Sequence, residues 1–537
     1  MKHGVDARRL GNGVTSWLAV VVGYSGVAIG ADEPVPSSSP TDSGSVMRQD
    51  GLASRAAGAI SDARGRAGGE PRIASRAIPP PVRFDLRVLR AQAGAQPPGS
   101  PADGAPPPPP APEPRVVPNL EAAAAERALG GGEPTEETAK AAPSEQATTP
   151  LMRALKLDDS PVRVYGWIQN SYTGNANGRP ANGLNFGVNP NNQADRWMGN
   201  QYYLIVENPL EQNDSVNFGF RVDNLFGNDW HFNYMQGLFN RAFVPGHLGY
   251  DLSQLYGEAH LPVLTPGGLD VKAGLWYTLA GYEQVPAISR PLLSVPYMFN
   301  YGQPFRHVGV VTTLHLTPRI NLYNGSINGW DRWIDERYIW GYIGGFSWAS
   351  ADARTNVAFT CVSGPDQFPR FLAANQPIYP TGYINIPSLA GLPNPGYAHN
   401  TRTLFTTVLT HRWDDKLTQV VESDQAWELN VPGLASDGLN GAPKTARWFS
   451  VGNWLLYQAT PKLTGVWRGE AFWDPTGART GYADTYYEMT VGLIYKPKHS
   501  IWIRPEARYD WAQSGKPYSN ETRNSQLTLG VDVIFLY

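Results

Sequence analysis

The sequence predicts an all-β protein, a transmembrane antiparallel β-barrel of about 16 strands preceded by a disordered N-terminal segment. Three observations support this prediction. Segments of alternating apolar and polar residues recur from Pro161 onward, and the connections between them alternate between short and long. All but one of the 17 tryptophans and all but one of the 26 tyrosines lie beyond residue 150. A period of two is typical of strands with one apolar and one polar face.

The first 30 residues have the pattern of a cleavable export signal. Positive charge at Lys2, Arg8 and Arg9 precedes a short apolar stretch over 14–27, and small residues stand before Ala31. The alternative is a retained membrane-anchoring helix, for which the apolar stretch is short. We therefore expect a signal peptide over residues 1–30.

Residues 31–150 are dominated by Ala, Pro, Gly, Ser and Arg, with a proline run at 106–110. A segment of this composition buries too little apolar surface to offset its loss of conformational entropy, so it predicts a disordered periplasmic segment. The alternating stretch over 82–88 could dock on a periplasmic or cell-wall partner, although an unbound linker is the simpler interpretation. The remaining residues, 151–537, form the predicted barrel domain.

Sixteen alternating segments follow, long enough for the ~9–11 residues that a tilted membrane strand needs. Their predicted first residues are Val162, Gln201, Ser215, Leu252, Leu269, His307, Arg319, Tyr338, Arg354, Thr401, Lys416, Ala446, Lys462, Thr485, Ser500 and Ser525.

The connections between these segments alternate in length. Tight turns are predicted at 317–319, 414–415, 460–462 and 496–498, and long connections rich in Gly, Asn and Pro at 174–200, 225–250, 280–306, 364–400 and 430–445. Short turns at one rim and long loops at the other are typical of bacterial outer-membrane barrels. An even strand number then places both chain ends on the periplasmic side.

Charged residues fall on one face of several predicted strands. Since a charge facing lipid near the membrane midplane costs a few kcal/mol, these side chains are expected to line the lumen. The predicted pore-lining residues are Arg221, Asp223, Lys272, Arg468, Glu470, Arg504, Glu506, Arg508 and Asp510. The alternative is a large soluble β-protein with these charges on its solvent face. Aromatic residues near strand ends favour the membrane, where they form interfacial girdles.

Composition excludes other classes of protein. The formal net charge of −3 indicates no nucleic-acid partner, and the single cysteine excludes an internal disulfide. No G-x-S-x-G, H-E-x-x-H or P-loop motif occurs, so we expect no enzyme, no cofactor and no metal site.

The final stretch, 525–537, sets apolar residues, among them Phe535 and Tyr537, against Gln526, Thr528 and Asp532. A strand with a terminal aromatic residue resembles the C-terminal signal by which the barrel-assembly machinery recognises outer-membrane barrels. We expect Phe535 and Tyr537 to form this membrane-insertion signal.

The connection over 279–306 is unusually rich in aromatic residues, prolines and opposite charges. Such a segment could fold into the lumen after the fifth strand and filter solutes by size and charge. The candidate constriction residues are Glu283, Arg290, Arg306 and His307. The alternative, an external lid packed on its neighbours, remains open.

Three short stretches carry a family resemblance: 273–283 (AGLWYTLAGYE), 299–309 (FNYGQPFRHVG) and 328–331 (NGWD). Together they resemble the putative β-barrel porin-2 (OmpL-like) family, over roughly residues 160–537. The resemblance implies an outer-membrane barrel of the porin type and no particular solute.

The expected function is therefore a passive, water-filled diffusion channel for small hydrophilic solutes or ions in the bacterial outer membrane. The first alternative is a non-conducting structural or adhesive barrel that acts through its surface loops, for which the long connection 364–400 is suited. The second is a barrel enzyme such as a lipase or protease. The lipid bilayer is the expected partner, and whether the barrels form homotrimers stays open.

Overall fold

The computed structural model describes residues 150–157, 159–233, 235, 238, 248–333, 340–365, 401–431 and 444–537. The expected signal peptide, nearly all of the expected disordered segment and the predicted eighth strand start at Tyr338 lie outside these residues. So does the predicted connection 364–400 from residue 366 onward. No helix in the described ranges is long and apolar enough to cross a membrane.

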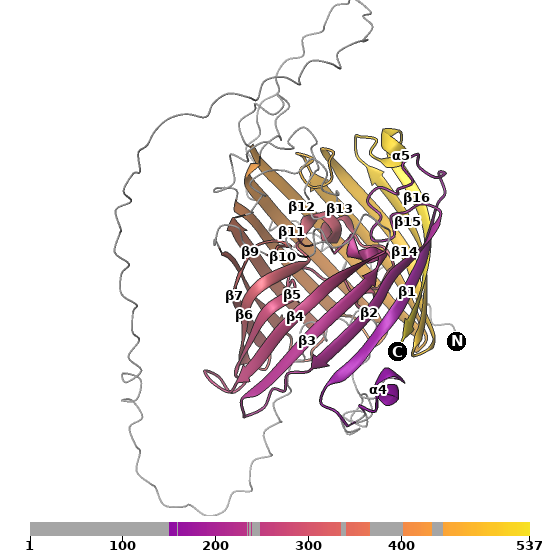
Figure 1. Cartoon of the computed structure of the whole chain (residues 1–537). Helices are drawn as coiled ribbons and strands as arrows, with labels where there is room; N and C mark the ends of the chain where they lie inside the picture. Colours follow the sequence, from indigo (N-terminus) through magenta and orange to yellow (C-terminus); the bar gives the residue numbers. More distant parts are fainter. Residues whose placement is uncertain are drawn as a thin grey trace, which may run out of the picture. The chain divides into compact units, whose positions relative to one another are not determined.

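Within the described part of the chain, 16 strands form one closed antiparallel barrel in which each strand pairs with its neighbours in sequence and β1 pairs with β16. The tilted strands are visible in Figure 1. The strands are β1 (Arg163–Asn175), β2 (Arg196–Asn208), β3 (Asn217–Gly227), β4 (Gly249–Leu261), β5 (Leu269–Tyr277), β6 (Arg306–Thr317), β7 (Ile320–Ile327), β8 (Gly341–Ala349), β9 (Thr355–Pro365), β10 (Thr401–Arg412), β11 (Leu417–Val431), β12 (Lys444–Thr460), β13 (Leu463–Asp474), β14 (Asp484–Lys498), β15 (Ile501–Ala512) and β16 (Ser525–Leu536).

The number, order and pairing of the strands confirm the predicted fold class. The largest shift of a described strand start is at β2, which begins at Arg196 and not at Gln201. A register shift between Gln169 and Asn170 of the paired strand β1 marks a bulge there. A bulge interrupts the strict period of two, so the sequence pattern recovers only the second half of β2.

One predicted turn lies too early in the chain. Pro497 was expected in a turn at 496–498, but β14 continues to Lys498 and the turn follows at His499 and Ser500. The pairing of β14 with β15 shifts between Tyr495 and Lys498. Proline is accommodated at such a bulge because no ladder donor is needed at that position.

The outer face of the barrel is apolar. In β16, Leu529, Val533 and Phe535 are exposed, whereas Gln526 and Asp532 on the alternate face are fully buried. Strand β3 repeats the pattern, with Phe218 exposed. A barrel that exposes apolar side chains outward and keeps its polar ones inside is suited to a lipid environment.

The barrel closes where the end of the chain meets β1. The backbone of Tyr537 exchanges two hydrogen bonds with Gly166, of 3.0 and 3.1 Å, and its hydroxyl donates to the carbonyl of Tyr203 at 2.9 Å. A Cβ on Gly166 would clash with this carbonyl, so the close approach requires glycine at position 166. Closure removes the unpaired sheet edge that cannot exist in lipid.

Short helical turns occur only in connections or next to the barrel in the described residues. They are α4 (Pro150–Leu155), η2 (Asn228–Trp230), η3 (Ala287–Ser289), the five-residue π-helix η4 (Met298–Gly302) and α5 (Tyr518–Glu521). Both η3 and η4 belong to the connection between β5 and β6, residues Thr278–Phe305, which we call the crossing segment. It lies between the front and back strands of the barrel in Figure 1.

Candidate functional site

The two ends of the crossing segment are joined at its base. The N–H of Thr278 donates to the carbonyl of Phe305 at 3.0 Å, and the hydroxyl of Thr278 lies 3.0 Å from Nε2 of His307. The carboxylate of Asp331 accepts the N–H groups of Phe305 and Arg306, both at 2.9 Å. The three stretches that carry the family resemblance therefore meet at one place, where the crossing segment leaves and rejoins the barrel wall.

Asp331 is a buried carboxylate in the connection between β7 and β8. Burial raises the pKa of this carboxyl from 3.8 to about 6, and the two backbone donors and Arg306 only partly offset the loss of hydration. The charge of the Asp331 carboxyl, at the base of the crossing segment, therefore changes at mildly acidic pH.

The first half of the crossing segment contacts strands β11 to β13. The N–H of Tyr282 donates to Glu422 of β11 at 3.0 Å. The carboxylate of Glu283 accepts from Trp454 Nε1 of β12 at 2.9 Å and from Arg468 of β13 at 3.0 Å. Burial raises the pKa of Glu283, while Arg468 opposes this shift. The predicted constriction residue Glu283 therefore points at the wall.

Around η3, strand β15 holds the backbone of the crossing segment. Arg504 donates to the carbonyls of Ala287 at 2.9 Å and Arg290 at 2.6 Å. Arg290 itself is fully buried and lies 3.8 Å from the carboxylate of Asp229 of η2. Burial lowers the pKa of Arg290 because the charged guanidinium loses its hydration.

In the middle of the crossing segment, side chains of β13 and β15 bond to its backbone. The carboxylate of Glu506 accepts the N–H groups of Leu293 at 2.9 Å and Ser294 at 3.1 Å. Arg468 donates to the carbonyl of Ser294 at 2.7 Å, and Arg508 donates to that of Val295 at 2.6 Å. Hydrogen bonds that involve an ionised partner are about twice as strong as neutral ones.

The second half is anchored at η4. Glu470 of β13 accepts the N–H groups of Tyr297 and Met298, at 2.6 and 2.5 Å. Farther along, the amide of Gln303 donates to Glu422 and, at 2.8 Å, to Asp424, and Trp448 Nε1 donates to the carbonyl of Gly302 at 3.0 Å.

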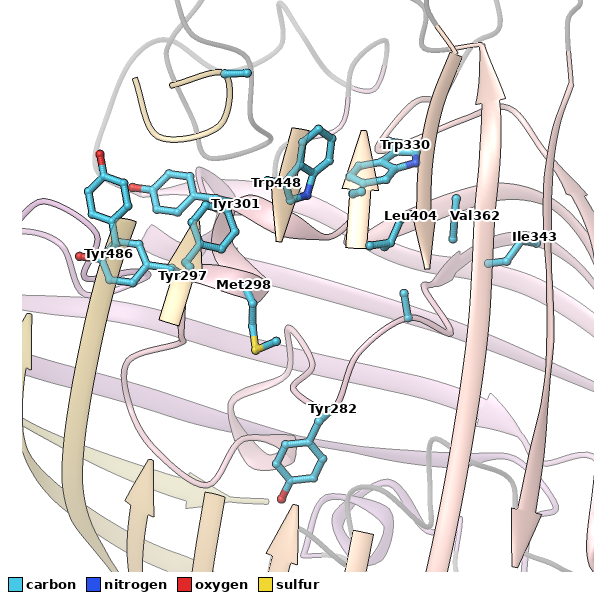
Figure 2. Close-up of a cluster of buried hydrophobic side chains, with 14 of the residues drawn as sticks. Tyr282, Tyr297, Met298, Tyr301, Trp330, Ile343, Val362, Leu404, Trp448 and Tyr486 are labelled. Atoms are coloured by element: carbon cyan, nitrogen blue, oxygen red, sulfur yellow. The ribbon is translucent and has the colours of Figure 1, made fainter. Parts of the chain in front are cut away.

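Apolar contacts complete the attachment. Tyr282, Tyr297 and Met298 belong to a buried cluster that reaches the inner side of β8, β9 and β10, where Ile343, Val362 and Leu404 are fully buried (Figure 2). The inner face is apolar on this stretch of wall, where the cluster excludes water.

The predicted constriction residues near β6 also have partners. Arg306 forms two hydrogen bonds with Asp251 of β4, at 2.9 and 3.0 Å, and a further one with the carbonyl of Asn233. His307 lies 2.9 Å from the carbonyl of Gly329 through Nδ1. Glu283 and Arg306 thus contact different parts of the wall, and their effect on ions in the pore stays a prediction.

The remaining predicted lining residues divide into two groups. Arg468, Glu470, Arg504, Glu506, Arg508 and Asp510 are buried, and the first five bond to the backbone of the crossing segment. Arg221 and Lys272, near Asp223, line a cavity of about 450 Å³ at the short-turn end of β1–β7, with Gln284 and Pro286 of the crossing segment on its boundary.

Several residues of this site were missed in the sequence. Glu422 and Asp424 stand two apart in β11, the same spacing by which Arg468 and Glu470 of β13 were predicted, so alternation could have identified these two acids. Asp331 lies within one of the resemblance stretches, but nothing local indicates that it binds Phe305 and Arg306. Among the described residues, no group of three or more His, Cys, Asp or Glu is arranged to hold a metal ion.

Comparison with solved structures finds barrels of low sequence identity. The outer membrane channel DcaP of Acinetobacter baumannii has 10% identity, 70% coverage of this chain, 97% of its own and a TM-score of 0.44. OprB of Pseudomonas putida has 12% identity, coverage of 72% and 96%, and a TM-score of 0.45. The trimer form of OmpT of Vibrio cholerae has 10% identity, coverage of 70% and 99%, and a TM-score of 0.42.

No curated protein matches the chain. The family described as "Putative beta-barrel porin-2, OmpL-like" matches residues 161–537, which include every strand of the barrel and all three resemblance stretches. The chain is thus a bacterial outer-membrane porin and belongs to the putative β-barrel porin-2, OmpL-like family.

Proposed function

We propose that this porin is a passive diffusion channel for small hydrophilic solutes or ions, and that the crossing segment narrows it. The single observation that carries the proposal is the path of the segment, whose backbone bonds to side chains of β11, β13 and β15 on the inner side of the wall. The segment begins at β5 and ends at β6, and β13 lies halfway around the closed barrel from β5. The N–H of Ala287 also donates to Gln201 of β2 at 2.9 Å. A chain that contacts both sides of a closed barrel crosses its lumen.

The crossing segment acts as a fixed aperture and not as a swinging lid. Its backbone N–H groups donate to carboxyl side chains at Tyr282, Ser294 and Tyr297, and both ends are joined at Thr278 and Phe305. Opening it would leave several buried polar groups without partners, each at a cost of about 1–3 kcal/mol. Its aromatic residues pack on the apolar wall and add to this cost.

Solutes pass on the side of β1–β7. The cavity of about 450 Å³ lies there, between the inner face of these strands and the near side of the crossing segment. Arg221 and Lys272 line it, and both are only partly buried, in contrast to Arg468 and Arg508 beneath the segment. A wall of mixed charges keeps this side wet and permeable to polar solutes.

Replacement of the crossing segment by a short turn tests the proposal. Because Thr278 and Phe305 are already paired, a Gly-Asn-Gly linker in place of residues 280–303 can reconnect β5 and β6 as a hairpin. We expect a several-fold rise of single-channel conductance in planar bilayers and faster entry of larger sugars into liposomes. The matched control replaces Asp414 and Asp415 of a tight turn by Asn-Gly. We expect this control to have the conductance of the wild type.

Equal conductance of the wild type and the segment-replaced variant, both folded as barrels, would remove the segment from the permeation path. A wild-type barrel that inserts into bilayers but passes no current would overturn the channel proposal. That result would favour the structural or adhesive alternative.

A further inference from the structure

The cavity on the β1–β7 side is bounded by parts of the chain that lie far apart in sequence. Tyr165 and Trp167 of β1 form one side, Tyr256 of β4 and Tyr323 of β7 lie farther around the wall, and Gln284 of the crossing segment bounds it from the lumen. Its volume of about 450 Å³ falls in the ~300–1,000 Å³ range of small-molecule sites. The cavity is therefore large enough for a solute to stop in it.

The charged groups around this cavity compensate one another. Arg221 bonds to Asp223 at 2.7 Å and lies 3.3 Å from Glu207, and Lys272 lies 3.8 Å from Glu258. Each cation around the wall lies beside a carboxylate, so the wall presents hydrogen-bonding groups and no dominant charge. An ion held here would gain little from a wall whose fields cancel.

The acid at the far side, Asp270, is engaged in the same way. Its carboxylate lies 2.6 Å from His260 Nδ1 and 2.9 Å from His315 Nε2, and it accepts from the amide of Gln212 at 2.6 Å. With its oxygens occupied, this acid is poorly placed to bind a solute cation. Arg163, at the strand end, is exposed to solvent and its charge is screened.

Aromatic and amide side chains supply the remaining lining. Tyr165, Trp167, Tyr256, Tyr277 and Tyr323 bring five rings to one cavity, and Gln284 brings an amide group. The amides of Gln254 and Asn321, also in the lining, already bond to other protein groups. The rings are held in place: Trp167 stacks on Tyr203 at 4.2 Å, and the Lys272 ammonium lies 4.3 Å from the centre of the Tyr256 ring. Rings cover the C–H faces of a solute, while the amide of Gln284 and the paired ions meet its hydroxyl groups.

We propose that this cavity is a binding site for a neutral, polyhydroxylated solute the size of a mono- or disaccharide. Only such a solute uses both features at once, because it has apolar C–H patches and many hydroxyl groups but no net charge. The inference names the class of solute that the channel carries. It rests on the proposed function, because the channel is the route by which the solute reaches the cavity. Binding itself requires only the cavity.

The test measures permeation and binding separately on the full-length porin. Glucose and maltose are added to open channels in potassium chloride, with gluconate and glucosamine as charged probes of matched size. We expect saturable reduction of the current by the neutral sugars and about tenfold weaker effects of the charged probes. Isothermal titration in detergent measures the same affinities without any requirement for conduction.

Two variants address the site. Tyr256→Leu removes a ring, and Gln284→Leu removes an amide at nearly constant volume. Each variant is expected to raise the sugar concentration that half-blocks the channel about tenfold. The potassium chloride current without sugar is expected to persist. The control is Tyr457→Leu, because Tyr457 lies on the outer face and is 51% exposed. We expect it to bind sugar as the wild type does.

The outcomes distinguish the two proposals. Conduction without sugar block and without heat of binding overturns the sugar site and leaves the channel intact. Sugar binding without conduction supports the site and overturns the channel. Stronger block by gluconate or glucosamine than by glucose overturns the neutral-solute assignment, as does equal loss of block in Tyr457→Leu.

Discussion

Arg468 donates a hydrogen bond of 3.0 Å to Glu283, a residue 185 positions earlier in the chain. The same guanidinium donates to Glu488 at 2.6 Å and to the carbonyl of Ser294 at 2.7 Å. One inward-facing arginine of β13 thus joins the barrel wall to both the first half and the middle of the crossing segment. Because these groups are buried, the arrangement depends on every partner being present.

Arg468→Met is expected to loosen the crossing segment. The substitution removes the cationic partner of the buried Glu283 and leaves Glu488 with Arg508 alone, at 3.5 Å, which costs about 3–5 kcal/mol. The heat-modifiable transition on gels is expected at lower temperature, and the open-channel current is expected to be larger and noisier. Arg447→Met is the control, since Arg447 is exposed on the outer face of β12. Identical behaviour of the two variants would show that Arg468 does not hold the segment.

Asp331→Asn is expected to change the pH dependence of stability. The pKa of Asp331 is raised from 3.8 to about 6 by burial, so the folded protein favours the protonated acid. Protonation of Asp331 therefore stabilises the folded state fully below about pH 4, and this stabilisation is lost as pH rises through about 6. Asparagine keeps an oxygen acceptor for Phe305 and Arg306 and does not ionise.

The stability of Asp331→Asn relative to the wild type should therefore increase between pH 4 and pH 7, by up to about 3 kcal/mol. Thermal unfolding of detergent-solubilised protein at pH 4, 5, 6 and 7 measures this difference. Asp415→Asn, in an exposed turn, controls for the removal of one negative charge. A difference between Asp331→Asn and wild type that does not vary with pH would count against the argument.

Glu283→Gln and Arg306→Gln are expected to shift ion selectivity in opposite directions. Loss of Glu283 leaves excess positive charge at Arg468, whereas loss of Arg306 leaves excess negative charge at Asp251. We expect changes of about twofold in the cation-to-anion permeability ratio, toward anions in the first variant and toward cations in the second. Reversal potentials under a potassium chloride gradient measure the ratio. If the single variants and the double variant all keep the wild-type ratio, neither residue influences the pore.

Deletion of Phe535–Tyr537 is expected to prevent assembly in the membrane. The backbone of Tyr537 pairs with Gly166, and Phe535 pairs with Ile168 of β1, so the deletion leaves part of the seam between β1 and β16 open. An open sheet edge leaves backbone groups without partners in lipid. Phe535→Leu, which keeps the strand, is the control. Normal heat-modifiable folding of the truncated chain would contradict both the closure argument and the proposed insertion signal.

The strand pattern was readable from the sequence because each strand meets lipid on one side and the lumen on the other. In β15, Ile503 and Arg504 face opposite ways by the pleat alone, whatever the rest of the chain does. Turn chemistry, as at Thr317 and Arg319, then sets the connections and the strand count. The miss at Pro497 and the late start assigned to β2 both occur at bulges, where one extra residue disrupts the period of two.

The sequence by itself determined the strand number, the antiparallel order and which residues of each strand face inward, because these follow from local alternation and turn residues. Only the tertiary structure decided what the inward residues contact. Glu506 and Glu470 bind backbone N–H groups of Ser294 and Tyr297, more than 170 residues away. A backbone N–H is the same in every residue except proline, so no sequence pattern marks which one a distant carboxylate will reach.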